Sequence, residues 1–146
     1  MTDIQAALGL SQMSRLDSLV ARRHQIASRY DSALSSLPII IPLQASDTYS
    51  SYHLYPIRIN KNCSGRVQRE IYDILWQCEI AANIHYIPVH RQPFYEKLGF
   101  AKGEFPEAEE FHKEVLSLPI FPTLGEGQDK VIASLRDVFN QENTDE

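Results

Sequence analysis

Residues that could do chemistry gather in one short run, His85-Tyr86-Ile87-Pro88-Val89-His90-Arg91-Gln92-Pro93-Phe94-Tyr95. The run holds two histidines, two tyrosines and an arginine within eleven residues. Its two prolines fix φ and lack a backbone N–H, which is unfavourable in a helix interior or a central strand. The sequence therefore predicts a shaped loop here, of the kind that carries binding chemistry when a rigid scaffold holds it.

The two histidines of this run allow two interpretations. In the functional one, His85 and His90 hydrogen-bond a ligand or shuttle a proton at the mouth of a cleft. In the structural one, His85 ends a strand and its ring nitrogens hydrogen-bond to backbone carbonyls. The residue types alone favour this structural interpretation. No metal site is predicted, because a spacing of five in a proline-containing segment is not the helical spacing of a ligand pair.

Other catalytic patterns are missing from the sequence. It contains no phosphate-binding glycine loop, no zinc-protease motif and no nucleophile elbow. Ser117 and Cys63 have no partner that the sequence places nearby, so a free-standing hydrolase using His90 and Ser117 is rejected. Cys78 falls on an apolar helix stripe and is interpreted as a core residue. Two isolated cysteines fit a reduced, cytoplasmic setting.

The bulk properties are those of one soluble domain. The chain has 146 residues, of which 43% are hydrophobic and 23% are charged, enough for a real core. No run of about 20 apolar residues exists, so no membrane span is predicted. The net charge is −5, and no basic cluster extends beyond Arg22-Arg23. This charge balance argues against nucleic acid as a partner.

A long helix is predicted from the N-terminus to a point before Pro38. Thr2 and Gln5 have the spacing of a capping box. Further along the helix a single apolar stripe is formed by Leu16, Leu19, Val20, Ile26, Tyr30, Leu34 and Leu37. The first turns are instead apolar on all sides, which indicates burial against another chain or domain. The alternative is a frayed terminus with a few exposed leucines. The residues expected at this interface are Ile4, Leu8, Leu10 and Met13.

Three strands and three further helices are predicted after Pro38. Alternation predicts a strand over 52–59, and two further strands are predicted over 80–86 and 116–121. One helix is expected after a cap at Ser64 and another with Pro106 as its first residue. The last helix is expected to carry one apolar face, formed by Val131, Ile132, Leu135, Val138 and Phe139. The predicted class is α+β: a small, mostly antiparallel sheet of three to four strands, helices packed on one face, and a long N-terminal helix. The predicted divisions are a linking or interface helix (1–37), a small C-terminal α/β domain (38–139) and a disordered acidic tail (140–146).

Four blocks of the chain carry a family resemblance. They are Met1-Thr2-Asp3-Ile4-Gln5-Ala6-Ala7-Leu8-Gly9-Leu10, His85-Tyr86-Ile87-Pro88-Val89-His90, Phe105-Pro106-Glu107-Ala108-Glu109 and Leu116-Ser117-Leu118-Pro119-Ile120-Phe121-Pro122. In this order and spacing they resemble the nucleotide-sugar aminotransferases, pyridoxal-phosphate (PLP) enzymes of the aspartate-aminotransferase fold. The combination looks most like the subgroup that aminates UDP-4-keto-6-deoxy-N-acetyl-L-altrosamine on the way to pseudaminic acid.

The resemblance covers only the family's C-terminal portion, and it sets the functional expectations. It implies that the loop borders a sugar-binding cleft, with His85, Tyr86, His90 and Arg91 as substrate-binding residues, and that the N-terminal helix lies near a dimer interface. It implies PLP and a nucleotide sugar as ligands of the full-length parent.

The resemblance also implies that the chain by itself lacks the catalytic amine. The family's Schiff-base lysine lies upstream of the matched blocks, and PLP chemistry requires that amine. We therefore expect no PLP on this chain and no activity alone. The alternative hypothesis is a non-catalytic α/β module that associates, as a homo-oligomer, through its apolar N-terminal helix. The lysines that fail to match are Lys61, Lys97, Lys102, Lys113 and Lys130.

Overall fold

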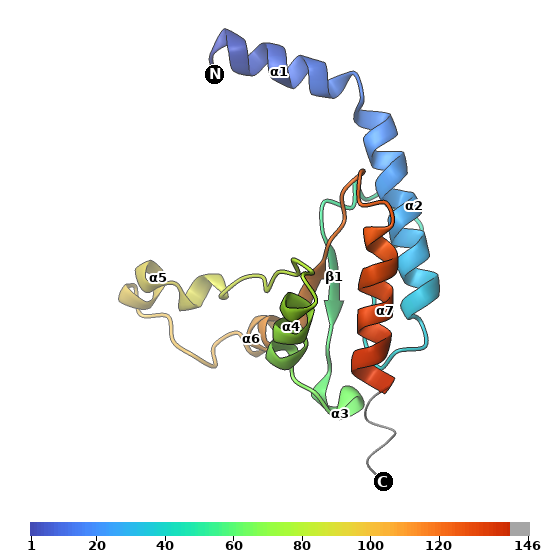
Figure 1. Cartoon of the computed structure of the whole chain (residues 1–146). Helices are drawn as coiled ribbons and strands as arrows, with labels where there is room; N and C mark the ends of the chain where they lie inside the picture. Colours follow the sequence, from blue (N-terminus) through green and yellow to red (C-terminus); the bar gives the residue numbers. More distant parts are fainter. Residues whose placement is uncertain (141–146) are drawn as a thin grey trace.

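The computed structural model describes residues 1–140, except for the side chains of Lys61 and Cys63. Most elements surround a small sheet, while helix α1 (Asp3–Met13) and helix α5 (Pro93–Lys97) stand away from it (Figure 1). The predicted acidic tail falls on residues 141–146, outside the described residues. Asn140, which the prediction placed in that tail, ends helix α7 (Gly127–Asn140).

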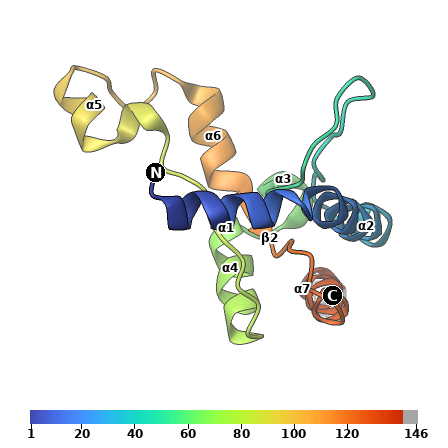
Figure 2. The same cartoon turned by 90° about the horizontal axis from the view of Figure 1, so that it is seen from above.

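The helix predicted before Pro38 is observed as two, α1 and α2 (Leu16–Leu34). The capping box is confirmed: Thr2 N–H donates to Gln5 Oε1 at 2.9 Å, and Gln5 N–H donates to Thr2 Oγ1 at 3.3 Å. Between the helices, Ser14 Oγ donates to the carbonyl of Ser11, a local bond that competes with the helical ladder. The chain changes direction there, so that α1 runs across the line of α2 (Figure 2), and α1 projects away from the core (Figure 1).

The sheet has two antiparallel strands, β1 (Tyr55–Arg58) and β2 (Val115–Leu118). The predicted three to four strands are not confirmed. Ile40 forms a single bridge to Arg58 on one edge, and Asn83 forms a single bridge to Ser117 on the other.

The predicted strand at 80–86 stops at this one bridge because its partner residues are used elsewhere. From the Asn83–Ser117 bridge, the next hydrogen-bonded antiparallel pair would be His85 with Val115, followed by Tyr86 opposite Glu114. Glu114 is the last residue of helix α6 (Pro106–Glu114), and the Val115 carbonyl accepts the side-chain N–H of Gln68. The strand therefore gives way to an irregular segment, which leads into the proline-rich run.

The core lies between the sheet and the helices α2, α4 (Gln68–Gln77) and α7. Ile26, Tyr30 and Leu34 are buried on α2, which confirms the C-terminal half of its predicted stripe, whereas Leu16 is 44% exposed. Cys78 packs against this core, as predicted. Residues Val131, Ile132, Leu135, Val138 and Phe139 of α7 are buried, also as predicted.

The boundaries of the middle helices follow local capping. Pro106 begins α6 as predicted. The prediction that Ser64 caps the next helix is wrong. Ser64 ends the short helix α3 (Lys61–Ser64), and its Oγ donates to the Arg66 carbonyl at 2.9 Å. Val67 occupies the cap position of α4, and its N–H donates to Glu70 Oε2 at 3.2 Å.

Candidate functional site

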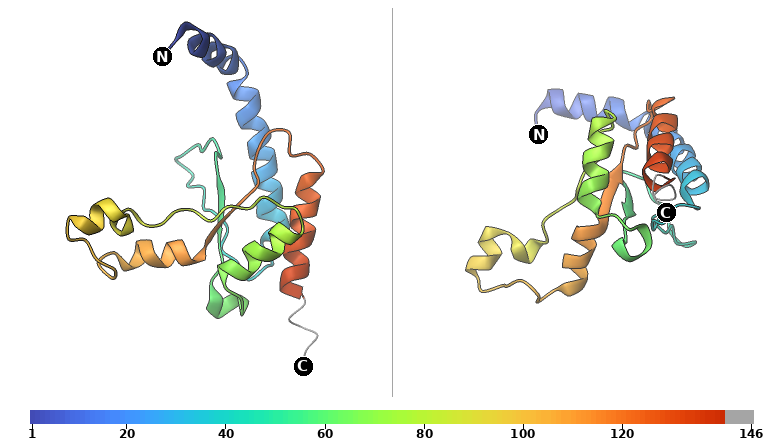
Figure 3. Two further views of the ribbon diagram at one scale, coloured as in Figure 1. Left: turned by 60° about the vertical axis from the view of Figure 1, so that its left-hand side comes forward. Right: turned by 60° about the horizontal axis from the view of Figure 1, so that its bottom comes forward.

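The predicted loop forms an arm, which we define as residues 85–105. Figure 3 shows the arm leaving the sheet and returning through α6. It contains a 3-10 turn, η1 (Val89–Arg91), and helix α5. Pro88 occupies the cap position of η1 and Pro93 is the first residue of α5, so each proline starts a short turn. The prediction of a proline-shaped segment is confirmed, although it includes these two short helices.

His90 is held inside the arm. Its side chain is 7% exposed, and its Nε2 lies 2.9 Å from Oε1 of Glu109 on α6. The N–H of Gly103 donates to the same oxygen at 2.6 Å. The Gly103 amide, followed by His90, lowers the pKa of Glu109 below its ordinary value. The Glu109 carboxylate thus joins two segments of the arm, at His90 and at Gly103, to α6.

The other three predicted site residues have different surroundings. Tyr86 is 75% exposed, and Arg91 Nε donates to Glu96 Oε1 at 2.9 Å. His85 lies against Tyr86, with 4.6 Å between ring centroids, and its Nε2 is buried without a hydrogen-bond partner among the described residues. The structural interpretation of His85, in which backbone carbonyls satisfy the ring, is therefore wrong for this nitrogen.

Two depressions flank the arm. One, of about 350 Å³, is apolar apart from His90 and the Tyr95 hydroxyl; it is lined by Val89, His90, Tyr95, Phe100, Phe105 and Ala108. The other, of about 360 Å³, is lined mainly by charged groups: Ile87, Pro88, Arg91, Glu96, Lys102, Glu109, His112 and Lys113. Among the polar residues that line the second depression, only Arg91 was predicted to bind substrate. The others could not be predicted, because most of them come from separate segments that only the fold brings together.

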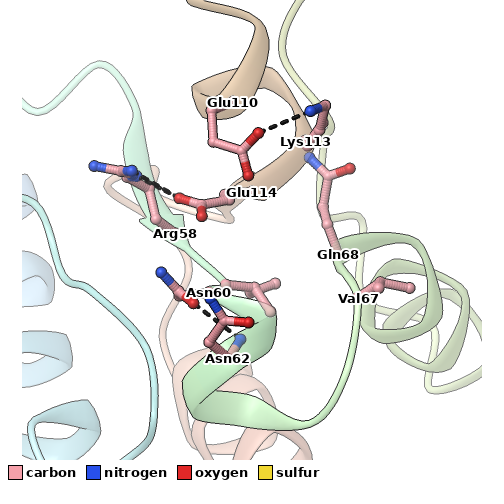
Figure 4. Close-up of a pocket in the computed structure, with 9 residues that line it drawn as sticks. Arg58, Asn60, Asn62, Val67, Gln68, Glu110, Lys113 and Glu114 are labelled. Atoms are coloured by element: carbon pink, nitrogen blue, oxygen red, sulfur yellow. Dashed lines mark hydrogen bonds and ion pairs between the residues drawn. The ribbon is translucent and has the colours of Figure 1, made fainter. Parts of the chain in front are cut away.

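A larger polar cleft, of about 470 Å³, lies between β1, α4 and α6 (Figure 4). Its charged side chains pair with one another: Arg58 with Glu114 at 2.7 Å, and Lys113 with Glu110 at 2.7 Å. The Gln68 amide donates to the His112 carbonyl at 3.0 Å. The cleft therefore uses its polar groups to join α6 to the sheet, and it is a weaker candidate for a ligand site than the arm.

The described lysines do not fit the anchoring of PLP. Lys97, Lys102, Lys113 and Lys130 are all exposed, and Lys130 Nζ pairs with Glu79 at 3.2 Å. A Schiff-base lysine needs a setting that leaves its amine unprotonated, such as a desolvated pocket. Within residues 1–140, leaving aside the side chain of Cys63, no group of three or more His, Cys, Asp or Glu side chains could hold a metal ion. Among the described residues, no helix is long and apolar enough to cross a bilayer.

Comparison with known proteins decides the family. The profile of the DegT/DnrJ/EryC1/StrS aminotransferase family matches residues 1–136. The chain belongs to this family. Its sequence is 37% identical to the spore coat polysaccharide biosynthesis protein SpsC of Bacillus subtilis, over 94% of this chain and 36% of SpsC.

Solved structures give the same family assignment. A sugar aminotransferase of Streptococcus pneumoniae, in its PLP form, superposes with a TM-score of 0.87 at 34% identity, over 97% of this chain and 36% of that one. PseC of Helicobacter pylori, an aminotransferase involved in pseudaminic acid biosynthesis, superposes with a TM-score of 0.84 at 29% identity, over 97% and 38%. This DegT-family chain spans about a third of the length of the relatives that it matches.

The comparisons support the resemblance in part. They show a family of PLP-dependent sugar aminotransferases, as the four blocks implied. They do not confirm the altrosamine subgroup: the chain is similar both to SpsC, at 37% identity in sequence, and to PseC, at 29% identity in the structural superposition.

Proposed function

We propose that this chain supplies one wall of the sugar-binding cleft of a PLP-dependent aminotransferase. The enzyme would aminate a 4-keto-6-deoxy nucleotide sugar for pseudaminic acid or a related surface polysaccharide. The observation that carries the proposal is the family match over residues 1–136. The polysaccharide role of SpsC and the pseudaminic acid role of PseC support the substrate class. The setting proposed is the cytoplasm, with the enzyme acting as a homodimer.

In this proposal the cofactor supplies the chemistry of amino transfer, and the residues of this chain bind the sugar. PLP supplies an electron sink for amino transfer when it is bound. The cofactor would be held by the part of the family enzymes that this chain does not span. The residues of the arm would bind and orient the sugar: the exposed Tyr86 hydroxyl and Arg91 by direct contact, and His85 and His90 by shaping the pocket.

A chimaera tests the proposal. This chain would replace the matched C-terminal portion of PseC, and amination of a UDP-linked 4-keto-6-deoxy sugar would be followed by mass spectrometry. We expect turnover, and we expect Tyr86→Ala to lower it about tenfold, which corresponds to about 1.4 kcal/mol. Tyr49→Ala is the control, because Tyr49 is equally exposed, at 75%, but stacks on His24 away from the arm. A folded, PLP-loaded chimaera without turnover would contradict the proposal.

One observation favours the second candidate function, a non-catalytic association module. No residue of α1 is buried, and its apolar side chains Ile4, Leu8, Leu10 and Met13 are between 62% and 83% exposed. Exposed apolar side chains concentrated on one helix are typical of an interaction surface. The two candidates are compatible, since the wall of a dimeric enzyme would also need a partner for this helix.

A further inference from the structure

The carboxylate of Glu109 is the most enclosed acidic contact of the arm. Its side chain is 12% exposed, and Oε1 meets both His90 Nε2, at 2.9 Å, and the Gly103 N–H, at 2.6 Å. Gly103 has φ +94°, a conformation that other residues rarely adopt, and this conformation belongs to the turn that carries its amide. Since a backbone N–H can only donate, Oε1 acts as an acceptor toward Gly103.

The charge state of Glu109 sets the role of the facing imidazole nitrogen. The pKa of Glu109 lies below its ordinary value, first because the Gly103 amide donates to it and then because His90 does. The carboxyl group is therefore ionised at neutral pH, and an ionised carboxylate offers no proton. His90 Nε2 must then carry the proton of the contact.

We propose that Glu109 is a positioning residue that fixes His90 as the Nε2–H tautomer. In a neutral imidazole with Nε2 protonated, Nδ1 is the nitrogen with a free lone pair. Nδ1 would then be the atom of His90 that can accept a proton or a hydrogen bond from a ligand or from a neighbouring part of the enzyme. The role toward a ligand rests on the proposed function, whereas the tautomer assignment does not.

The packing around the ring supports a fixed orientation. The His90 ring lies 4.8 Å from the Phe105 ring between centroids, and its side chain is 7% exposed. Other charged groups near Glu109 are already engaged or on the rim: Arg91 Nε pairs with Glu96, and Lys102 is exposed. The ring is therefore held by apolar contact on one side and by a single carboxylate at Nε2.

Nitrogen NMR of the intact, ¹⁵N-labelled chain tests the assignment. A long-range ¹H–¹⁵N spectrum, recorded where the imidazole is neutral, should show a protonated Nε2 and an unprotonated Nδ1 for His90. The His90→Gln variant identifies the signals by their loss. An Nδ1–H tautomer in the wild-type chain would overturn the proposal.

Variants separate positioning from general stability. Glu109→Leu keeps a side chain of similar size but removes the accepting oxygen, so we expect the His90 signals to shift toward a mixture of tautomers. Glu107→Leu is the matched control, since Glu107 is exposed on the same helix, and the His90 signals of this variant should match the wild type. An unchanged His90 tautomer in a folded Glu109→Leu variant would overturn the positioning role.

The outcomes distinguish this inference from the proposed function. If the tautomer assignment fails while the PseC chimaera turns over, only the role of Glu109 is lost. If the assignment holds and the chimaera, loaded with PLP, does not aminate the keto sugar, the proposed function is lost and the positioning role within the chain stands.

Discussion

Among individual side chains, two carboxylates of α6 join this helix to its neighbours. Glu109 binds His90 and Gly103, while Glu114, which is 8% exposed, binds Arg58 at 2.7 Å. Buried carboxylates need such partners, because desolvation is costly for an unpaired charge. These two carboxylates of α6 therefore tie the helix to the arm and to the sheet edge.

The Arg58–Glu114 pair gives a stability prediction. Arg58→Met would leave the buried Glu114 carboxylate without its partner, and we expect a loss of about 2 kcal/mol in the free energy of unfolding. Arg69→Met is the control, because its pair with Asp73 at 3.1 Å is exposed and should be worth less than about 0.5 kcal/mol. Urea titration measures both, and equal losses would contradict the importance of the buried pair.

Glu109 gives a prediction about pH. Its pKa is lower in the folded chain than in the unfolded chain, so its contribution to stability is present above the unfolded pKa and is lost as the pH falls through the folded one. The stability difference between the wild type and Glu109→Gln should therefore shrink as the pH falls from about 6 to about 3. Urea titrations across this range measure it. A difference that grows on acidification would contradict the lowered pKa.

Individual residues show where sequence reasoning reaches its limit. The run His85–Tyr95 could be identified because its proline spacing and residue types are local features. The partner of His90 could not, because Glu109 is 19 residues away and only the return of α6 brings it within 2.9 Å. The exposure of Tyr86 and the burial of His90 likewise depend on tertiary packing.

Secondary-structure elements show the same limit. Periodicity predicted the buried faces of α2 and α7, because those faces pack against each other and against the sheet. Periodicity did not predict the break at Ser14. Within the described chain, α1 has no packing partner that would keep it in line with α2. The apolar segment 80–86 predicted a strand, but Glu114 is helical and the Val115 carbonyl accepts the side-chain N–H of Gln68.

The packing of α7 gives a prediction at its buried face. Leu135 is completely buried in the core, so Leu135→Ala should lower the free energy of unfolding by about 3 kcal/mol through lost burial and a cavity. Leu43→Ala, at a position that is 95% exposed, should change it by less than about 0.5 kcal/mol. Thermal or urea unfolding measures the two variants. A small effect at Leu135 would mean that α7 does not pack as described.

The molecule as a whole combines a packed core with an exposed apolar helix. The alternative function and the homo-oligomer both predict that α1 is covered by a second copy. The double variant Leu8→Glu/Leu10→Glu should then abolish association in sedimentation velocity, whereas Gln12→Glu, which adds charge on the same exposed helix, should not. A wild-type chain that stays strictly monomeric at high concentration would contradict association through α1.

We expect the chain alone to be catalytically silent, because its described lysines are exposed, and borohydride trapping tests this expectation. The pure chain would be mixed with PLP, reduced and weighed by mass spectrometry. We predict no specific, stoichiometric adduct, because Lys97, Lys102, Lys113 and Lys130 are exposed ammonium groups without an enclosed setting for the aldehyde. One stoichiometric, borohydride-stable PLP adduct on a single lysine would show that this chain anchors the cofactor itself, and it would contradict the division between cofactor domain and sugar-facing wall.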